Sequence, residues 1–360
     1  MTLYINIFMS GNDLINDIRN SPDFQGYSFS NYKRTEVRNT LIKSILNEKV
    51  EEACYWSAEL VCAGHYGEVW EIIILILSKH IHLANPKISI YVENRYTQFK
   101  KIINNGEFIS ELEIRNDYRI RNIFAEIISF LCYSNKKPAF ELIKLGKKQP
   151  FDLISFGEKL KATNNEYAKP IFLDEDPREL YIAINEFMFH ISPQSKNTRE
   201  ACYWIEWFIE FSLICKKRKN KCVIQSRKVP VQPKFMNEPI WLVWDSILYI
   251  GKDDPFTSKL LYSLQNIFCI KFTEATPKRR RYLLYYAISL IIENVDKTIP
   301  LTTQKNKIEN ILSNIHNIYK QIKKNEKSPN TDYLFQNMEK QDNLKKSIAQ
   351  MNLVNSIDFK

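Results

Sequence analysis

Four side chains have the types and spacing that could hold a metal ion. Cys62 and His65 form a Cys-x-x-His pair, and His80 and His82 follow two positions apart. Thiolates and imidazoles are the usual zinc ligands. On a helix, however, His80 and His82 would point about 200° apart, and no acid completes a standard pattern. The sequence therefore favours structural histidines, and we expect no metal and no other cofactor.

The acidic triplet Asp174-Glu175-Asp176 resembles part of a carboxylate metal site. A two-metal site needs further acids from elsewhere in the chain. Asp176 precedes Pro177, and Glu179 follows three residues after Asp176, which is typical of a capped helix start. We therefore interpret Asp176 as a helix cap. The same pairing predicts two more helix starts, at Asp254-Pro255 and Thr276-Pro277.

Motifs of the common catalytic chemistries are missing from the sequence. There is no Gly-x-x-x-x-Gly-Lys-Ser/Thr, no Gly-x-Gly-x-x-Gly and no Gly-x-Ser-x-Gly. Only 8 of the 360 residues are glycine, against a usual share of about 7%. We expect a protein without enzymatic activity, and an enzyme with an unrecognised motif is the alternative.

Basic residues gather in two islands that contain no acid. The first island lies between positions 212 and 235 and contains Lys216, Lys217, Arg218, Lys219, Lys221, Arg227, Lys228 and Lys234. The second island is Lys278-Arg279-Arg280-Arg281. Together they carry +12 against a net charge of +10, so the rest of the chain is nearly neutral.

Such islands predict an anionic partner, either nucleic acid or an acidic protein. The alternative is a basic loop that only keeps the chain soluble, or a nuclear-import-like patch. We expect both islands to share one face and form a single site. Its candidate residues are Lys216, Lys217, Arg218, Lys219, Lys221, Arg227, Lys228, Lys278, Arg279, Arg280 and Arg281.

Helical periodicity dominates the segments that must position these residues. Apolar stripes predict helices over residues 120–131 and 308–322, the second closed by Pro329. Residues 88–92 could form a short strand, although no second strand is evident to pair with it. The six tryptophans lie among apolar neighbours, which favours core packing over base stacking. The fold class we predict is all-α, with little or no β-sheet.

An identical pentamer occurs twice, as Glu52-Ala53-Cys54-Tyr55-Trp56 and as Glu200-Ala201-Cys202-Tyr203-Trp204. Each copy precedes a second tryptophan-bearing segment, which predicts an internal duplication. The alternative is a chance match between two unrelated core helices. We expect a first helical half over 1–170, a second half with the basic insertion over 171–300, and a terminal helix with a polar tail over 301–360.

The cysteines and the apolar runs indicate in which cellular compartment the protein is found. Seven cysteines form an odd set without regular spacing, which favours a reducing compartment over a disulfide framework. Residues 1–10 have no basic region typical of a signal peptide. The strongest apolar run, residues 72–77, is far shorter than a membrane span. We expect a soluble intracellular protein without a membrane partner.

Several further motifs occur along the chain: Glu52 to Leu60, Gly64-His65-Tyr66, Ser78 to Lys87, Arg115-Asn116-Asp117, Phe124-Ala125-Glu126, Cys202 to Trp207 and Trp244-Asp245. Together they resemble an uncharacterised family of nucleocytoplasmic large DNA viruses, with phycodnavirus and mimivirus relatives. The resemblance implies a viral protein found in the infected-cell cytoplasm (the viral factory) or in the virion, with other viral proteins as partners. It implies no catalytic residues.

A fainter resemblance is to the C-terminal helical domain of clamp-loader-like ATPases, without the ATPase module. It is carried by Ala53, Tyr55-Trp56, Ala58, Ala63-Gly64 and Leu83-Ala84-Asn85-Pro86. The function we expect is a non-enzymatic binding or scaffold protein that engages an anionic partner through the basic islands. The alternatives are a minor capsid or virion-internal component, and an orphan oligomerisation domain in replication.

Overall fold

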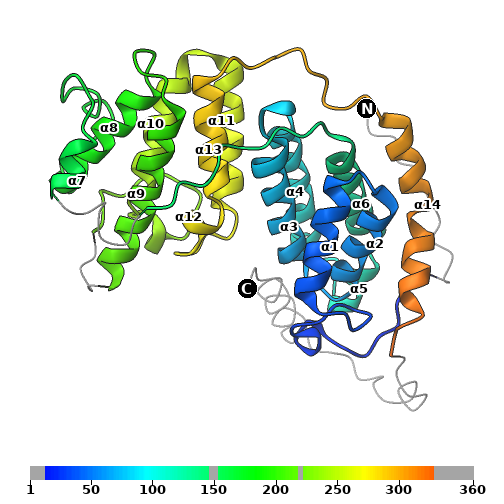
Figure 1. Cartoon of the computed structure of the whole chain (residues 1–360). Helices are drawn as coiled ribbons and strands as arrows, with labels where there is room; N and C mark the ends of the chain where they lie inside the picture. The colour runs from blue at the N-terminus through cyan, green and yellow to red at the C-terminus, as the bar shows by residue number, and fades with distance from the viewer. Residues whose placement is uncertain (1–12, 146–152, 218–221, 328–360) are drawn as a thin grey trace. The chain divides into compact units, whose positions relative to one another are not determined.

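The computed structural model describes residues 13–145, 153–217 and 222–327 (Figure 1). About 64% of these residues are helical and none forms a strand, so the all-α prediction is confirmed. The one β-type pairing in the described ranges is an isolated bridge between Tyr27 and Lys33. No helix in these ranges combines the length and the apolar content that crossing a bilayer requires.

The chain divides into two compact units. Unit 1 comprises residues 1–76, 94–135 and 300–360, and unit 2 comprises residues 77–93 and 136–299. These boundaries differ from the expected ones. The expected first half ended at residue 170, whereas the described residues from 136 to 170 belong to unit 2. The terminal helix belongs to unit 1 because it packs on two helices of that unit.

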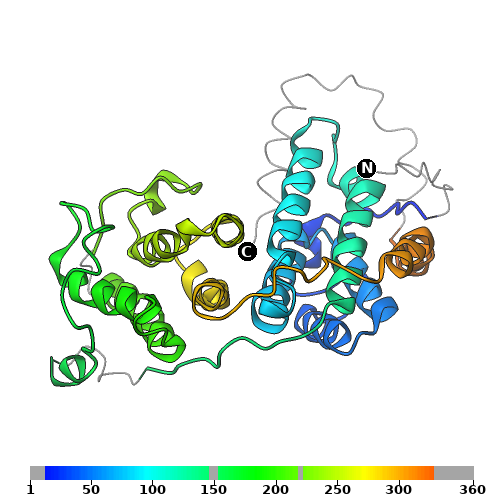
Figure 2. The ribbon, with the colours of Figure 1, turned by 90° about the horizontal axis from the view of Figure 1, so that it is seen from above.

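Unit 1 is built around α2, which packs against α1, α3, α6 and α14. Figure 2 shows α14 end on at the edge of this unit. An aromatic cluster fills the core, where the ring centroids of Trp70 and Phe99 are 5.5 Å apart and those of Phe99 and Phe124 are 5.4 Å apart. The helices are α1 (Arg34–Leu46), α2 (Val50–Cys62), α3 (Tyr66–Leu75), α5 (Glu111–Asn116), α6 (Tyr118–Tyr133), α14 (Lys305–Lys323) and the part of α4 (Ile88–Asn104) from Asn94.

Unit 2 is organised around α13, which packs against α8, α9, α10 and α11. Phe268 lies between two buried tryptophans, 5.9 Å from Trp241 and 5.4 Å from Trp244. The helices of this unit are α7 (Leu153–Glu158), α8 (Tyr181–Ile191), α9 (Thr198–Lys217), α10 (Ile240–Ile250), α11 (Pro255–Cys269), α12 (Thr276–Arg279) and α13 (Arg281–Ile292). Unit 2 also contains most of the π-helical segment η2 (Ile76–Ile81) and the turn η3 (His82–Ala84).

Several local predictions are confirmed. Helices α6 and α14 cover the two predicted apolar stripes. Asp254 caps α11 by accepting the Thr257 N–H, with Pro255 at the first helical position. The tryptophans belong to the core, since five are buried and only Trp56 is half-buried. All seven cysteines are free thiols, and five of them are buried.

Three local predictions are wrong. Residues 88–92 begin helix α4, because Ile88 and Val92 lie one turn apart and are both buried. Asp176 caps no helix, since its carboxylate accepts the N–H of Leu173, three residues before it. Thr276 is the first residue of α12 instead of its cap, and its hydroxyl accepts the Thr273 N–H.

The two pentamers occupy comparable places in their units. Each lies near the start of a helix, α2 or α9, and in each the tyrosine and tryptophan rings meet edge to face, at 5.2 and 5.3 Å. α2 packs against α1, α3 and α6, and α9 packs against α8, α10 and α13. Counted from α1 and from α8, these three partners are the first, third and sixth helices of each series, and α2 has a further partner in α14. The duplication itself stays a prediction.

His82 gives the fold a specific pH dependence. It is 2% exposed, has a φ of 50° and lies with its ring centroid 4.8 Å from that of Tyr286. Burial lowers the pKa of His82 from 6.5 to about 4. The stabilisation is complete above pH 6.5, where the unfolded chain is also neutral, and it is lost progressively as the pH falls from 6.5 to about 4.

We expect His82→Gln to remove this part of the pH dependence, which amounts to about 3 kcal/mol between pH 7 and pH 4. The measurement is the free energy of unfolding in urea at several pH values, with His316→Gln as an exposed control. Equal slopes against pH in the parent protein and in His82→Gln would contradict the assignment.

Candidate anion-binding site

Two of the predicted binding residues are buried inside unit 2. Arg280 is 2% exposed, and its Nη1 lies within hydrogen-bond distance of the carbonyl oxygens of Ile267, Phe268 and Ile270. These carbonyls belong to the end of α11, where a helix has no N–H donors of its own to satisfy them. Arg280 is therefore a capping residue for α11, and we correct its assignment to the binding site.

Arg227 is the second correction. It is 7% exposed and donates from Nη1 and Nη2 to the two carboxylate oxygens of Asp176, at 3.1 and 2.6 Å. Its Nε donates to Asp245 at 2.6 Å, and its remaining hydrogen bonds go to the carbonyls of Ile171 and Gln225. A guanidinium with this set of partners holds chain segments together and is not open to an outside anion.

Three further cations pair with acids that lie elsewhere in the sequence. Lys216 lies 3.2 Å from Glu238 and 3.5 Å from Glu274, Lys278 lies 3.8 Å from Glu210, and Arg281 lies 2.6 Å from Glu206. Helix α9 therefore carries Lys216 near its end, and it carries Glu210 and Glu206, the acidic partners of the second island, about two and three turns earlier. The described parts of the two islands lie on neighbouring elements, with acids between them.

The carboxylate of Glu206 shows why Arg281 is held in place. Glu206 is buried, and burial raises its pKa while the nearby Arg281 opposes that rise. Tyr285 also donates its hydroxyl to this carboxylate at 2.9 Å. Arg281 thus compensates a buried charge, which is a role inside the fold.

The candidate cations on the surface are Lys217, Lys228, Lys278 and Arg279. Arg218, Lys219 and Lys221 lie outside the described residues. Whether all these cations serve one partner stays a prediction.

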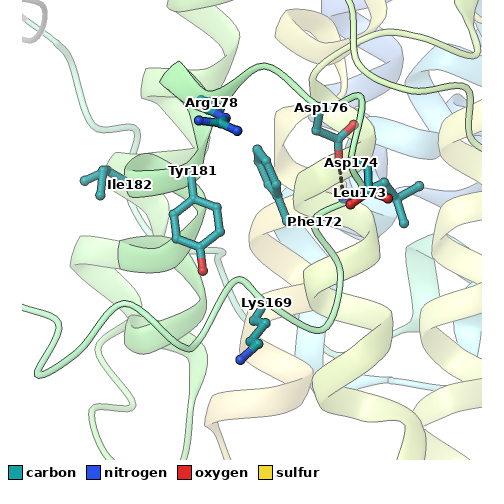
Figure 3. Close-up of a pocket in the computed structure, with 8 residues that line it drawn as sticks. All are labelled: Lys169, Phe172, Leu173, Asp174, Asp176, Arg178, Tyr181 and Ile182. Atoms are coloured by element: carbon teal, nitrogen blue, oxygen red, sulfur yellow. Dashed lines mark hydrogen bonds between the residues drawn. The ribbon is translucent and has the colours of Figure 1, made fainter.

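A pocket of about 470 Å³ lies beside this region, in the loop that leads into α8. Figure 3 shows its lining residues, with Arg178 and Lys169 at opposite ends of an aromatic pair. The pair is Phe172 and Tyr181, whose rings meet edge to face with centroids 4.9 Å apart. The full lining is Lys169, Phe172, Leu173, Asp174, Asp176, Arg178, Tyr181 and Ile182.

Asp176 positions one wall of this pocket. Besides Arg227, its carboxylate accepts the N–H of Leu173 at 2.8 Å and the N–H of Gln225 at 2.9 Å. Through Arg227 the same carboxylate is linked to Asp245 on α10. Burial raises the pKa of Asp245, and the contact with Arg227 opposes the rise. The pocket loop and the segment that follows the first island are therefore fixed to the same buried guanidinium.

The sequence does not predict this pocket. Its acidic triplet is typical of a helix start, and no motif marks the aromatic and basic residues on either side of it. The available signal was the interleaving of Lys169, Phe172, Arg178 and Tyr181 within thirteen positions. Such interleaving is also common on surfaces that bind nothing. The hydrogen bonds of Asp176, which fix the loop and so form the pocket, are visible only in the structure.

The four candidate metal ligands do not form a site within one unit. Cys62 and His65 belong to unit 1, and His80 and His82 belong to unit 2. The Nε2 of His65 lies 3.2 and 3.0 Å from the carbonyl oxygens of Phe24 and Tyr27. Over the described ranges, no three His, Cys, Asp or Glu side chains are grouped to bind a metal ion.

Comparisons with known proteins add no relative. A scan against models of protein families, a search of curated proteins and a search of solved structures found no match to this chain.

The pocket geometry depends on the ion pair between Asp176 and Arg227. We expect Asp176→Ala to lower the free energy of unfolding by about 3 kcal/mol, because it leaves a buried guanidinium short of a counter-charge. Asp174→Ala, two residues away and exposed, is the matched control and should change stability by less than about 0.5 kcal/mol. Urea denaturation measures both, and equal losses in the two variants would contradict the role of Asp176.

Proposed function

We propose that the protein is a non-enzymatic helical binding scaffold whose unit 2 engages an anionic partner, either nucleic acid or an acidic protein. The observation that carries the proposal is the division of charge between the units. Unit 2 contains 29 Lys and Arg against 20 Asp and Glu, and unit 1 contains 22 against 21. Nearly the whole excess of +10 thus lies in the unit that carries both basic islands.

The exposed cations can exchange their acidic partners within the chain for an anion of the binding partner. Lys278 and Glu210 are 59% and 37% exposed and 3.8 Å apart. Exposed pairs of this kind contribute about 0–1 kcal/mol, so a polyanion can replace the acid at little cost. The buried pairs of Arg227 and Arg281 do not offer this exchange.

The biological setting that we propose is infection by a large DNA virus, with the protein in the viral factory or in the virion. It is supported by the motif resemblance alone. The shared order of helix contacts in the two units supports a second proposal, that they arose by duplication and that the basic insertion between α9 and α10 specialised the second copy.

The test uses two matched sets of substitutions. Set A replaces Lys217, Lys228, Lys278 and Arg279 by Ser in unit 2, and set B replaces Lys43, Lys100, Lys101 and Lys320 by Ser in unit 1. Both sets change the net charge equally at exposed positions. Affinity for duplex DNA, single-stranded DNA and an acidic peptide is measured by fluorescence anisotropy over a range of salt concentrations.

We expect set A to weaken binding of the preferred polyanion and to reduce its salt dependence. For duplex DNA, each lost phosphate contact removes about 0.9 from the slope of log affinity against log salt. Set B should leave the slope nearly unchanged, and circular dichroism should show the same helix content in both. Equal effects of the two sets, or no binding to any polyanion, would overturn the proposal.

A further inference from the structure

We infer that the pocket beside Asp176 binds one unpaired nucleobase of a single-stranded nucleic acid, with the neighbouring phosphates on Arg178 and Lys169. The inference rests on the proposed function, and it names nucleic acid as the anionic partner.

The aromatic pair supplies a stacking surface. Phe172 and Tyr181 are both half-buried, and their rings stand at 80° to each other, so they form a corner in which one face can receive a flat ring. The Tyr181 hydroxyl donates to the Asn165 carbonyl at 2.6 Å, which fixes the orientation of that ring. Every base has a π-face, and stacking on an aromatic side chain is the common mode of binding unpaired bases.

Two cations of the pocket, Arg178 and Lys169, are available to contact the phosphates next to the base. In the part of the chain that the structure describes, the Arg178 side chain forms no hydrogen bond or ion pair. Among the described residues, Lys169 pairs only with Glu166, at 3.1 Å, and both side chains are more than two-thirds exposed. Figure 3 places the two cations at opposite ends of the rings, so a strand that crosses the pocket meets a cation on either side of the stacked base.

The carboxylates of the pocket favour a nucleobase over an acidic peptide as its ligand. Asp176 already accepts hydrogen bonds from Arg227 and two backbone N–H groups, which leaves Asp174 as the exposed acceptor. A carboxylate can accept an N–H from the exocyclic amine of cytosine, adenine or guanine. The same carboxylate repels an acidic side chain. Paired bases in a duplex are stacked in the helix and cannot enter.

The experiment measures the affinity of the full chain for oligo(dC), oligo(dT) and duplex DNA by fluorescence anisotropy. We expect Phe172→Ala and Phe172→Leu to weaken oligo(dC) binding by about 5- to 150-fold, the usual effect of removing one stacking ring. Duplex affinity should not change. Tyr262→Ala removes a 53% exposed ring from α11 of the same unit and should have no effect.

Two charge variants test the other contacts. Arg178→Gln should weaken single-strand binding and lower its salt dependence by about 0.7, whereas Arg199→Gln, an exposed arginine on α9, should not. Asp174→Asn should reduce the preference for oligo(dC) over oligo(dT).

The outcomes separate this inference from the proposed function. Unchanged oligo(dC) affinity in both Phe172 variants, together with weaker binding by set A, overturns the pocket assignment and leaves the proposed function standing. Binding of an acidic peptide but of no nucleic acid does the same. Absence of binding to any polyanion overturns both.

Discussion

The ion pairs of the buried Arg227 guanidinium are the interaction on which the structure around the pocket depends. Two carboxylates, Asp176 and Asp245, and two backbone carbonyls surround it. Arginine suits this position because its five donors lie in one plane and reach several acceptors at fixed angles. Since Asp176 also accepts two backbone N–H groups, one ion pair fixes the pocket loop, the end of the basic insertion and α10. Unit 1 also contains a buried arginine, Arg121, but its guanidinium donates to the carbonyls of Asp13 and Arg115 and to the amide oxygen of Asn116 instead of to carboxylates.

In the fold, acids from distant parts of the chain reach both basic islands. A stretch without acids predicts an open cationic surface only if no acid from another element reaches it. Glu206 and Glu210 on α9 reach the second island, and Asp176 reaches the first. The unit as a whole nevertheless keeps its excess of positive charge, because these acids neutralise only part of it. The exposed cations are therefore the ones that we propose for an anionic partner, while the buried ones stabilise the fold.

The sequence predicts the helical class well because its evidence is local. The stripes of α6 and α14 and the cap at Asp254 each depend on residues within a few turns of one another. The pocket could not be predicted in the same way. Asp176 meets Arg227 across 51 positions, and no local pattern distinguishes this contact from a helix cap. The apolar residues Ile88 and Val92 suit a strand and a helix equally well over so short a run, and only the burial of one helix face decides between them.

Photo-crosslinking tests the central claim, that unit 2 receives an anionic strand beside the Arg227 cluster, most directly. A single-stranded oligonucleotide with a photoreactive base is bound to the full chain, irradiated, and the modified peptides are identified by mass spectrometry. The account predicts crosslinks on the peptide that contains Phe172 and Tyr181, reduced when unlabelled strand competes. Crosslinks confined to unit 1, or spread over both units in proportion to their exposed surface, would contradict it.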